Sequence, residues 1–359
     1  MGEPQTELTI DAKRIGEDHP TYFIADIAAN HDGDLGRAKD LIYLAKEAGA
    51  DAAKFQHFKA ETIVSDHGFK SLGDQKSHQS RWKKSVFEVY KLASVSTDWT
   101  QALKETCDKA GITFFTSPYD FDLVDHIDPF VPAYKIGSGD ITWIDMVKRI
   151  ASKDKPYILA TGASTMDDVY RAVAAGLEIN TKLALLQCNT NYTGSLDNMR
   201  FVQLNVLKSY RVMFPKLILG LSDHTPGHAT VLGAVAIGAR VIEKHFTDDI
   251  SRVGPDHAFS MDPRSWKDMV DRTRELEASL GCGIKKVEDN EQQTIILQRR
   301  ALRAISDLPR GHIINAKDLS VLRPCPPGAV LPYEAVGLIG RKLRQEKREG
   351  EHFTHMDYE

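Results

Sequence analysis

Two histidines lie at the ends of neighbouring apolar runs of the sequence, and together they could hold a metal ion. His224 comes just after the run 217–222, and His245 lies near the end of the run 240–246. A divalent ion held by only two protein ligands keeps positions open for water and substrate, as suits a Lewis acid that polarises a carbonyl group. Imidazole binds Mn, Fe, Co or Zn, so the two histidines do not identify which metal is bound. The alternative is a pair of hydrogen-bonded loop histidines without a metal.

Lysines and hydroxyl groups at other strand ends suit a phosphate group, because ammonium groups supply charge and hydroxyl groups donate directional hydrogen bonds. Side chains alternate along a strand, so Lys54 shares a face with Gln56, and Glu243 shares a face with His245. A lysine of this kind taken alone is most often a surface residue, but the joint placement of several such groups favours a binding site. The phosphate candidates are Lys54, Lys135, Thr116, Ser138 and Ser164.

An alternation of strands and helices must position these residues. Short β-rich apolar runs recur between amphipathic helical stretches, and eight such units predict an α/β fold in which parallel strands close into a (β/α)8 TIM barrel. The active site of that fold lies where strands end and loops begin, and the candidates lie there. The predicted strands are 22–28, 52–58, 113–117, 133–138, 157–161, 183–188, 217–222 and 240–246.

The long segment 59–91 and the C-terminal part of the chain depart from this alternation. The segment 59–91 is too long for an ordinary connection, which indicates a functional loop such as a lid. Its aromatic residues Trp82, Phe87 and Tyr90 either form that lid or pack on the barrel. We expect a barrel domain at 1–280, a polar linker at 281–298 and a small β-rich domain at 299–359.

The composition argues against several classes of partner. Among 359 residues, 46 Lys and Arg stand against 50 Asp and Glu, and no basic run offers a footprint for nucleic acid or an anionic membrane. No apolar run approaches the ~20 residues that cross a bilayer, and the first residues lack the pattern of a signal peptide. The four cysteines form no CxxC pair, which argues for reduced thiols. We therefore expect a cytoplasmic protein that binds small molecules.

Several motifs occur in order along the chain. They are Ile24-Ala25-Asp26, Asn30-His31-Asp32-Gly33, Lys54-Phe55-Gln56, Thr116-Ser117-Pro118, Tyr134-Lys135-Ile136-Gly137-Ser138-Gly139, Gly220-Leu221-Ser222-Asp223-His224-Thr225, Lys244-His245-Phe246-Thr247 and Gly254-Pro255-Asp256. In these motifs the chain resembles the N-acetylneuraminate (sialic acid) synthase family. The resemblance extends from about Phe23 to Arg348 and includes a C-terminal domain similar to type III antifreeze protein, the SAF-type fold.

This resemblance implies a transferase that condenses phosphoenolpyruvate with an aldose such as N-acetylmannosamine, giving a nonulosonic (sialic-type) acid and phosphate. It implies Mn²⁺, or else Mg²⁺ or Co²⁺, on His224 and His245, which with Asp26 are the implied catalytic residues. It also implies that Arg323 reaches into the partner subunit's site, as in a domain-swapped homodimer. The implied substrate-binding residues are Lys54, Gln56, Thr116, Lys135, Ser138, Asp140, Ser164, Thr190, Tyr192, Ser222, Asp256 and Arg323, of which Gln56, Tyr192 and Asp256 face the sugar.

The departures from the family lie on the sugar side. Asp26 and Asp140 stand where the family usually has glutamate, and each carboxylate is withdrawn by over ~1 Å, enough to matter for orientation. Thr190 stands where an asparagine often contacts the ligand. Two alternatives therefore stay open: a synthase-like enzyme that uses a different aldehyde sugar, or a non-catalytic homologue that binds sugar or phosphoenolpyruvate. The intact histidines and lysines favour an enzyme.

Overall fold

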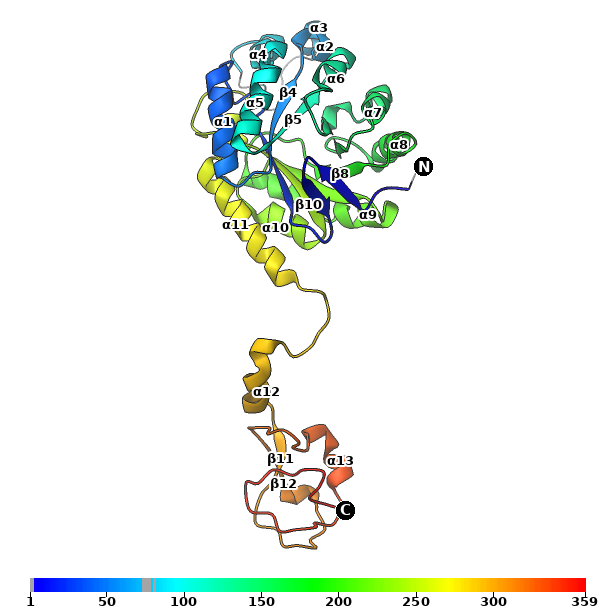
Figure 1. Ribbon diagram of the computed structural model, residues 1–359, viewed down its shortest axis with the longest axis vertical. Coiled ribbons are helices and arrows are strands. Elements are labelled where there is room, and N and C mark those ends of the chain that lie inside the picture. The colour runs from blue at the N-terminus through cyan, green and yellow to red at the C-terminus, as the bar shows by residue number, and fades with distance from the viewer. Residues whose placement is uncertain (1–2, 73–78, 80–81) are drawn as a thin grey trace. The chain divides into compact units, whose positions relative to one another are not determined.

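The computed structural model describes residues 3–72, 79 and 82–359. The chain divides into two compact units, one that ends at Gly281 and one from Cys282 to Glu359 (Figure 1). Each unit has an apolar core of its own.

The first unit is built on eight parallel strands. They are hydrogen-bonded in the order β5-β4-β3-β10-β9-β8-β7-β6, and the two end strands β5 and β6 contact each other, so the sheet curls into a nearly closed barrel. This arrangement confirms the predicted (β/α)8 barrel. The strands are β3 (Tyr22–Asp26), β4 (Ala52–His57), β5 (Thr113–Pro118), β6 (Tyr134–Ile136), β7 (Tyr157–Ala160), β8 (Leu183–Cys188), β9 (Ile218–Asp223) and β10 (Ala239–His245).

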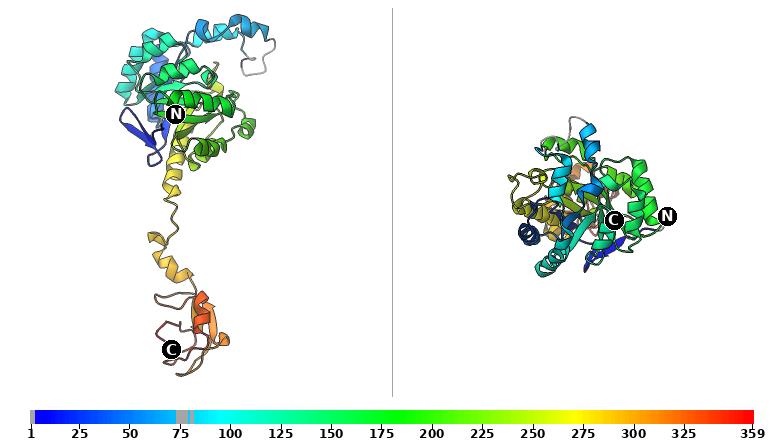
Figure 2. Two further views of the ribbon diagram at one scale, coloured as in Figure 1. Left: turned by 90° about the vertical axis from the view of Figure 1, so that its right-hand side faces the viewer. Right: turned by 90° about the horizontal axis from the view of Figure 1, so that it is seen from above.

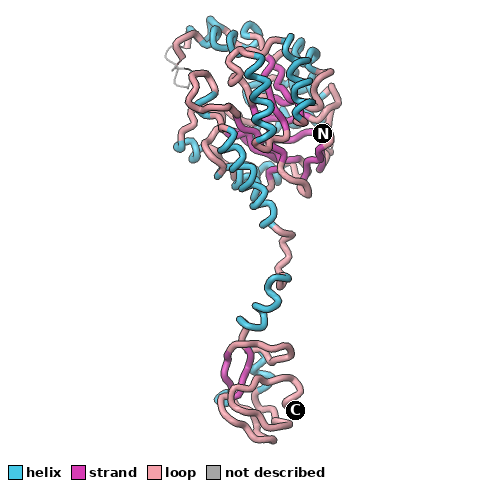
Figure 3. Tube along the Cα trace, turned by 60° about the vertical axis from the view of Figure 1, so that its left-hand side comes forward, coloured by secondary structure: helices cyan, strands magenta, loops and turns pink. Residues whose placement is uncertain are grey.

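Helices surround these strands, as Figure 3 shows. The first of them illustrates why they form: the Asp34 side chain caps the backbone N–H of Arg37, and Ala38, Leu41, Ile42 and Ala45 recur at helical spacing on the buried face. Within the described part of the chain, no helix combines the length and apolar character that crossing a membrane requires. The outer helices are α1 (Leu35–Glu47), α5 (Thr100–Ala110), α6 (Phe121–Ile127), α7 (Ile144–Ala151), α8 (Met166–Leu177), α9 (Val206–Met213), α10 (Ala229–Ala236) and α11 (Pro263–Leu280).

Strand alternation separates two apolar layers. Phe23, Ala25 and Phe55 belong to the layer between strands and helices, whereas Ile24 and Ala52 belong to a smaller cluster inside the barrel. Because successive side chains of a strand point to opposite faces, the parity of a residue decides whether it lies inside or outside the barrel.

A β-hairpin that the sequence did not predict contributes to the inner cluster. Strands β1 (Glu7–Ile10) and β2 (Lys13–Gly16) pair in antiparallel register. Their apolar residues Leu8, Ile10 and Ile15 are buried with the inward residues Tyr22 and Ile24 of β3. Since Tyr22 begins β3, the hairpin covers the amino end of the barrel.

The long connection after β4 forms short helices, which can be followed in Figure 2. These are α2 (Ala60–Ile63), α3 (Asp66–Ser71) and α4 (Val86–Ala93), followed by a 3-10 turn at Thr97–Trp99. The ring of Tyr90 lies 5.4 Å from that of Phe58 and 6.5 Å from that of Trp82, measured between centroids. Tyr90 therefore packs onto the end of β4 through Phe58.

The second unit is small and rich in turns. Its strands β11 (Ala301–Ala304) and β12 (Leu319–Leu322) pair in antiparallel register, and α12 (Gln292–Gln298) and α13 (Ala335–Leu338) accompany them. Part of the segment expected as a linker is thus helical, and the Ile296 carbonyl in α12 accepts a hydrogen bond from the Cys325 N–H. The core consists of Leu302, Ala304, Leu308, Ile314, Val330, Leu338, Leu343 and Phe353. Other 3-10 turns among the described residues are Ser138–Asp140, Leu196–Phe201, His257–Phe259, Asp289–Glu291, Ala316–Asp318 and Pro332–Glu334.

Candidate active site

The inner face of the barrel changes from apolar to polar toward the carboxyl ends of its strands. On β3 the inward residue after Ile24 is Asp26, and on β4 the inward residue after Ala52 is Lys54. Parallel register sets Lys54 beside Asp26, and Asp26 beside His245 of β10. Three of the predicted site residues, from three strands, therefore form one row across the barrel.

Two lysines and two carboxylates are buried in this polar layer. Lys54 Nζ donates to Asp26 Oδ2 at 2.7 Å, and Lys135 Nζ lies 3.0 Å from Glu243 Oε1. All four side chains are at most 6% exposed. Burial opposes the charge on Lys54, but Asp26 and Glu243 outweigh it and raise the pKa of the lysine. The pKa of Glu243 is lowered although burial opposes this, because Lys135 and Lys54 both face it.

The two histidines lie side by side as neutral imidazoles. Their ring centroids are 5.4 Å apart, and burial lowers the pKa of His224 to about 4 and that of His245 to about 3. His224 Nδ1 lies 2.8 Å from the Asn189 carbonyl oxygen. Since a carbonyl only accepts, that nitrogen carries the proton and Nε2 keeps its lone pair.

The donor set around these histidines fits a divalent ion. His245 Nδ1 is buried with no hydrogen-bond partner in the described structure, and carboxylate oxygens of Asp26 and Asp256 lie 3.6 Å and 3.9 Å from the His245 ring nitrogens. Among the described residues, no group of three or more His, Cys, Asp or Glu side chains is arranged to hold a metal ion. The side chains that could hold a metal ion here are His224 and His245, with other positions left to water or substrate.

Lys244 differs from the two inner lysines although it is equally buried. It points to the outer face, where Nζ donates to the carboxylate of Asp223 and to the Thr225 carbonyl at 2.6 Å. Asp223 also accepts from the Thr230 hydroxyl at 2.7 Å. This fully bonded pair joins β9 to β10 one residue before each histidine.

The predicted sugar-facing residues surround a pocket beside the histidines. Gln56 Nε2 donates to Asp26 Oδ2 at 2.9 Å, and the Tyr192 ring packs edge-on against His224 with centroids 4.4 Å apart. Asp256 Oδ2 accepts from the Ala29 N–H at 3.1 Å, and burial raises the pKa of Asp256 to about 7. The pocket has a volume of ≈130 Å³, and its lining includes Gln56, Phe58, Tyr90, Tyr192, His245 and Asp256.

Several predicted hydroxyl groups gather on the opposite side of the barrel mouth. Ser138 Oγ accepts from the Gly162 N–H at 2.9 Å, and Ser222 Oγ donates to Glu243 Oε1 at 3.1 Å. A Cβ atom on Gly162 would lie 2.4 Å from Thr190 Cγ2 and 2.9 Å from Ser138 Oγ, so glycine is what lets these two side chains approach. Ser138 and Ser222 thus lie at the polar layer, and Thr190 turns its methyl group toward Gly162.

Two other predicted residues have local partners or lie at the edge of this group. Ser164 Oγ donates to the Thr161 carbonyl at 2.6 Å, within its own turn. Asp140 lies in the turn after β6, where burial raises its pKa to about 6 and Lys135 opposes the shift. Asp140 therefore lies within electrostatic reach of Lys135.

Thr116 is the predicted phosphate residue that the structure does not bring to the others. Its Oγ1 lies 2.7 Å from His57 Nδ1 and donates to the Phe55 carbonyl at 3.0 Å, on the outer face of the strands. The inward residue is the next one, Ser117, whose hydroxyl is buried with no hydrogen-bond partner among the described residues. The parity of the inward residue Phe115 would have indicated Ser117.

Like Ser117, Glu243 lies in the polar layer but was not among the predicted site residues. The signal that could have indicated it is the strand face that it shares with His245. Arg323 lies in the second unit, exposed and directly after β12.

These features define a TIM-barrel site in which buried lysines and neutral histidines converge at the carboxyl ends of the strands. The chain matches the NeuB family over residues 41–285 and the SAF domain over residues 299–357. It belongs to the NeuB family.

Relatives with named activities cover nearly the whole chain. It is 36% identical to the N,N'-diacetyllegionaminic acid synthase of Legionella pneumophila, over 91% of this chain and 92% of that protein. It is 30% identical to the human N-acetylneuraminate-9-phosphate synthase, over 92% and 90%. The crystal structure of the N-acetylneuraminic acid synthetase from Leptospira borgpetersenii matches with a TM-score of 0.70 and 28% identity, over 82% of this chain and 97% of that one.

Proposed function

We propose that this protein is a metal-dependent synthase that condenses phosphoenolpyruvate with an aldose to give a nonulosonic acid and phosphate. The observation that carries the proposal is the polar layer, where Lys54 and Lys135 lie beside two neutral histidines. Cations suit an anionic substrate, and lone pairs on imidazole suit a metal ion. The named activities of the relatives support the same reaction class.

In this proposal the lysines bind phosphoenolpyruvate. Lys54 and Lys135 attract its phosphate and carboxylate, and the hydroxyls of Ser138 and Ser222 donate hydrogen bonds. Ser117 takes the place predicted for Thr116, because its hydroxyl is buried on the inner face without a partner in the described structure. Entry of the anion then replaces part of the ion pairing that these lysines have with Asp26 and Glu243.

The reaction joins C3 of phosphoenolpyruvate to the aldehyde carbon of the sugar. Water adds to C2, and the C2–O bond to phosphate breaks as inorganic phosphate leaves. Mn²⁺, Mg²⁺ or Co²⁺ on His224 and His245 would supply Lewis acidity to the aldehyde oxygen. Asp26 accepts hydrogen bonds from Lys54 and Gln56 and lies 3.6 Å from His245. It therefore orients these side chains between the phosphate of phosphoenolpyruvate and the aldehyde of the sugar.

The aldose is proposed to be N-acetylmannosamine or a related amino sugar. Gln56 and Asp256 offer polar atoms for its hydroxyl groups, whereas Phe58 and Tyr90 line the same pocket with apolar surface that suits an acyl methyl group. The short side chains of Asp26 and Asp140 favour a sugar other than the family's usual one, and this stays the second candidate.

Phosphate release tests the proposal. The protein is incubated with phosphoenolpyruvate, Mn²⁺ and a panel of aldoses, with and without N-acyl and phosphate groups, and inorganic phosphate and the keto acid are measured. We expect both products in equal amounts with at least one N-acylated aldose, and neither with His224→Ala. Binding of phosphoenolpyruvate without turnover of any aldose would favour the non-catalytic alternative instead.

Arg323 is proposed to act in the site of a second copy of the chain. Its planar guanidinium suits an acyl oxygen or a sugar hydroxyl. The test mixes His224→Ala and Arg323→Ala proteins and lets subunits exchange. A shared site regains both groups in one of the two sites of a mixed dimer, so activity returns; no activity above that of the parents would contradict sharing.

A further inference from the structure

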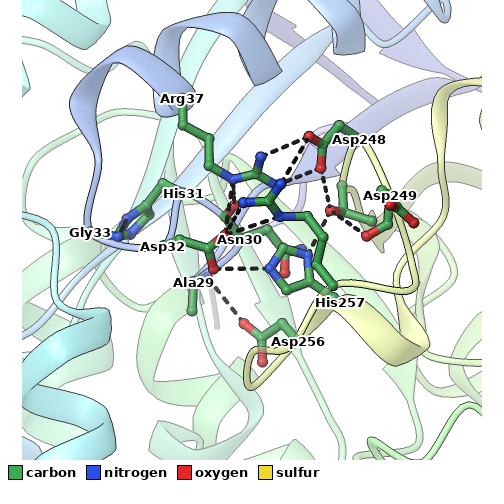
Figure 4. A network of polar contacts seen from close by, with 12 residues as sticks. Ala29, Asn30, His31, Asp32, Gly33, Arg37, Asp248, Asp249, Asp256 and His257 are labelled. Carbon is green, nitrogen blue, oxygen red and sulfur yellow. Dashed lines mark hydrogen bonds and ion pairs between the residues drawn. The ribbon is translucent and has the colours of Figure 1, made fainter.

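The loop that carries Asp256 is hydrogen-bonded to the loop after β3, and two of the residues involved, Asp32 and His257, have no role in the proposed reaction. Figure 4 shows these contacts, which connect residues 29–37 to residues 247–257. Asp256 and His257 are adjacent, and both contact the first loop. Asp256 accepts from the Ala29 N–H, and His257 lies against the side chain of Asp32.

His257 is completely buried and has a partner on each ring nitrogen. Its Nε2 lies 3.0 Å from Asp32 Oδ1, and its Nδ1 lies 2.7 Å from Thr247 Oγ1. Because a carboxylate only accepts, Nε2 carries the proton of this bond. A Cβ atom on Gly254 would lie 2.6 Å from His257 Cδ2, so the glycine of this motif leaves room for the imidazole.

Asp32 is itself held in place, so it can serve as a fixed anchor. Its backbone has φ +53°, which places the residue in the left-handed region. Arg37 Nε lies 3.1 Å from Asp32 Oδ2 while the same guanidinium is bonded to Asp248. Arg252 Nη2 reaches Asp32 Oδ2 at 3.0 Å from the solvent side.

We infer that Asp32 and His257 are a positioning pair that aims the Asp256 carboxylate at His245 and at the sugar pocket. Asp256 Oδ2 lies 3.9 Å from His245 Nδ1 and the residue lines that pocket. Asp256 and His257 share one planar peptide unit, and the Ala29 N–H holds the carboxylate itself, so a fixed imidazole limits where that carboxylate can lie. This inference rests on the proposed function, since it assigns the carboxylate to the sugar end.

A positioning role and a purely structural role predict different kinetics. Misplacing a group by about 1 Å can cost a factor of about a hundred in rate. A structural brace would alter thermal stability and leave the Michaelis constants of the folded enzyme unchanged. If the two residues position Asp256, their loss changes the Michaelis constant for the aldose. The constant for phosphoenolpyruvate stays unchanged, because Lys54 and Lys135 are held by other residues.

The test compares three variants with phosphoenolpyruvate and the best aldose of the panel. Asp32→Ala removes the anchor, and we expect the aldose constant to rise about tenfold or more. Asp32→Asn keeps an oxygen that accepts from His257, so the rise stays within about threefold. Arg252→Ala is the matched control: it removes a partner of the same carboxylate, but the arginine is 41% exposed and such pairs contribute little, so the change stays within about twofold.

Hydrogen exchange of the peptide spanning residues 247–257 supplies a readout that does not need turnover. We expect faster exchange in Asp32→Ala than in the wild type, and wild-type protection in Asp32→Asn and Arg252→Ala. Unchanged exchange in Asp32→Ala would overturn the inference, and so would faster exchange with an unchanged aldose constant. A wild-type enzyme that turns over no aldose would refute the proposed function, while the exchange experiment would still decide whether Asp32 holds this loop.

Discussion

The two ends of the barrel are formed by the same strands but have opposite chemistry. At the amino end, the hairpin residues Leu8 and Ile10 pack with inward apolar residues such as Ile24. Two residues further along the same strand, Asp26 is ion-paired with Lys54. Only two residues along the strand therefore separate the apolar inner layer from the layer that carries charged side chains.

This difference indicates that stability and chemistry are divided between layers. Burial of apolar surface stabilises a fold, whereas buried ion pairs contribute little net stability compared with apolar replacements. Substitutions at the amino end should therefore change the free energy of unfolding, and those at the carboxyl end should change turnover.

The largest effect is expected for the histidine pair. His224→Ala and His245→Ala should each lower kcat about a thousandfold or more, because each removes a proposed metal ligand, while the melting temperature stays close to that of the wild type. Chelation should abolish activity and Mn²⁺ should restore it, since two protein ligands give only modest affinity. Full turnover in excess chelator, with metal absent by elemental analysis, would contradict the assignment.

The matching substitution at the amino end is Ile10→Ala. Ile10 is fully buried in the inner cluster, so the free energy of unfolding should fall by about 2–4 kcal/mol. The kcat and both Michaelis constants should stay unchanged at a temperature where the variant is folded. Urea unfolding followed by circular dichroism gives the stability. A lower kcat in fully folded protein would break the proposed division between the ends.

A smaller effect is expected for the inner lysines. Lys135→Met keeps the chain length and removes the charge, so the Michaelis constant for phosphoenolpyruvate should rise about tenfold to a hundredfold. The constant for the aldose should change much less.

Lys244→Met provides the control for this substitution. Lys244 is as buried as Lys135 and also ion-paired, but it faces the outer layer. We expect lower stability and an unchanged constant for phosphoenolpyruvate. If the two variants raised that constant equally, burial rather than position would explain the effect.

The smallest effect is expected on the free energy of unfolding as the pH falls. Burial lowers the pKa of His31, in the loop after β3, to about 4. The pKa of a histidine in the unfolded chain is about 6.5. The unfolded chain therefore binds more protons in this window, so the stability that neutral His31 contributes is complete above pH 6.5 and is lost as the pH falls toward 4. Between pH 7 and pH 5 we expect a loss of about 1–2 kcal/mol.

His31→Asn tests this contribution. The variant should show a flatter dependence of unfolding free energy on pH than the wild type, as measured by denaturant titration at each pH. Parallel curves for the two proteins would show that His31 does not carry the acid sensitivity.

Strand parity explains how much of the site the sequence could predict. Lys54 and Gln56 were expected on one face, and both contact Asp26 inside the barrel. Thr116 carries a hydroxyl that would suit phosphate, but it lies on the outer face because Phe115 and Ser117 are the inward residues of β5. A shift of one residue exchanges the two faces of a strand.

Other features could not be derived from local patterns. The hairpin β1–β2 has no strong signal in the sequence, because most of its residues are polar or charged and its buried apolar side chains are few, namely Leu8, Ile10 and Ile15. The approach of Asp256 to His245 depends on a loop whose path is fixed by long-range contacts such as that of His257 with Asp32. Such contacts have no periodic signature in the sequence.

Closure of the barrel has a consequence for synthesis on the ribosome. Tyr22 of β3 pairs with Val241 of β10, and the backbone N–H of Thr21 donates to Glu277 in α11 at 2.6 Å. The nascent chain therefore exposes one edge of β3 until nearly the whole barrel has left the exit tunnel. Exposed strand edges and contacts between distant residues slow folding and favour aggregation. We expect nascent chains arrested before residue 239 to bind chaperones. Once α11 has been synthesised and the barrel can close, the chaperones should dissociate.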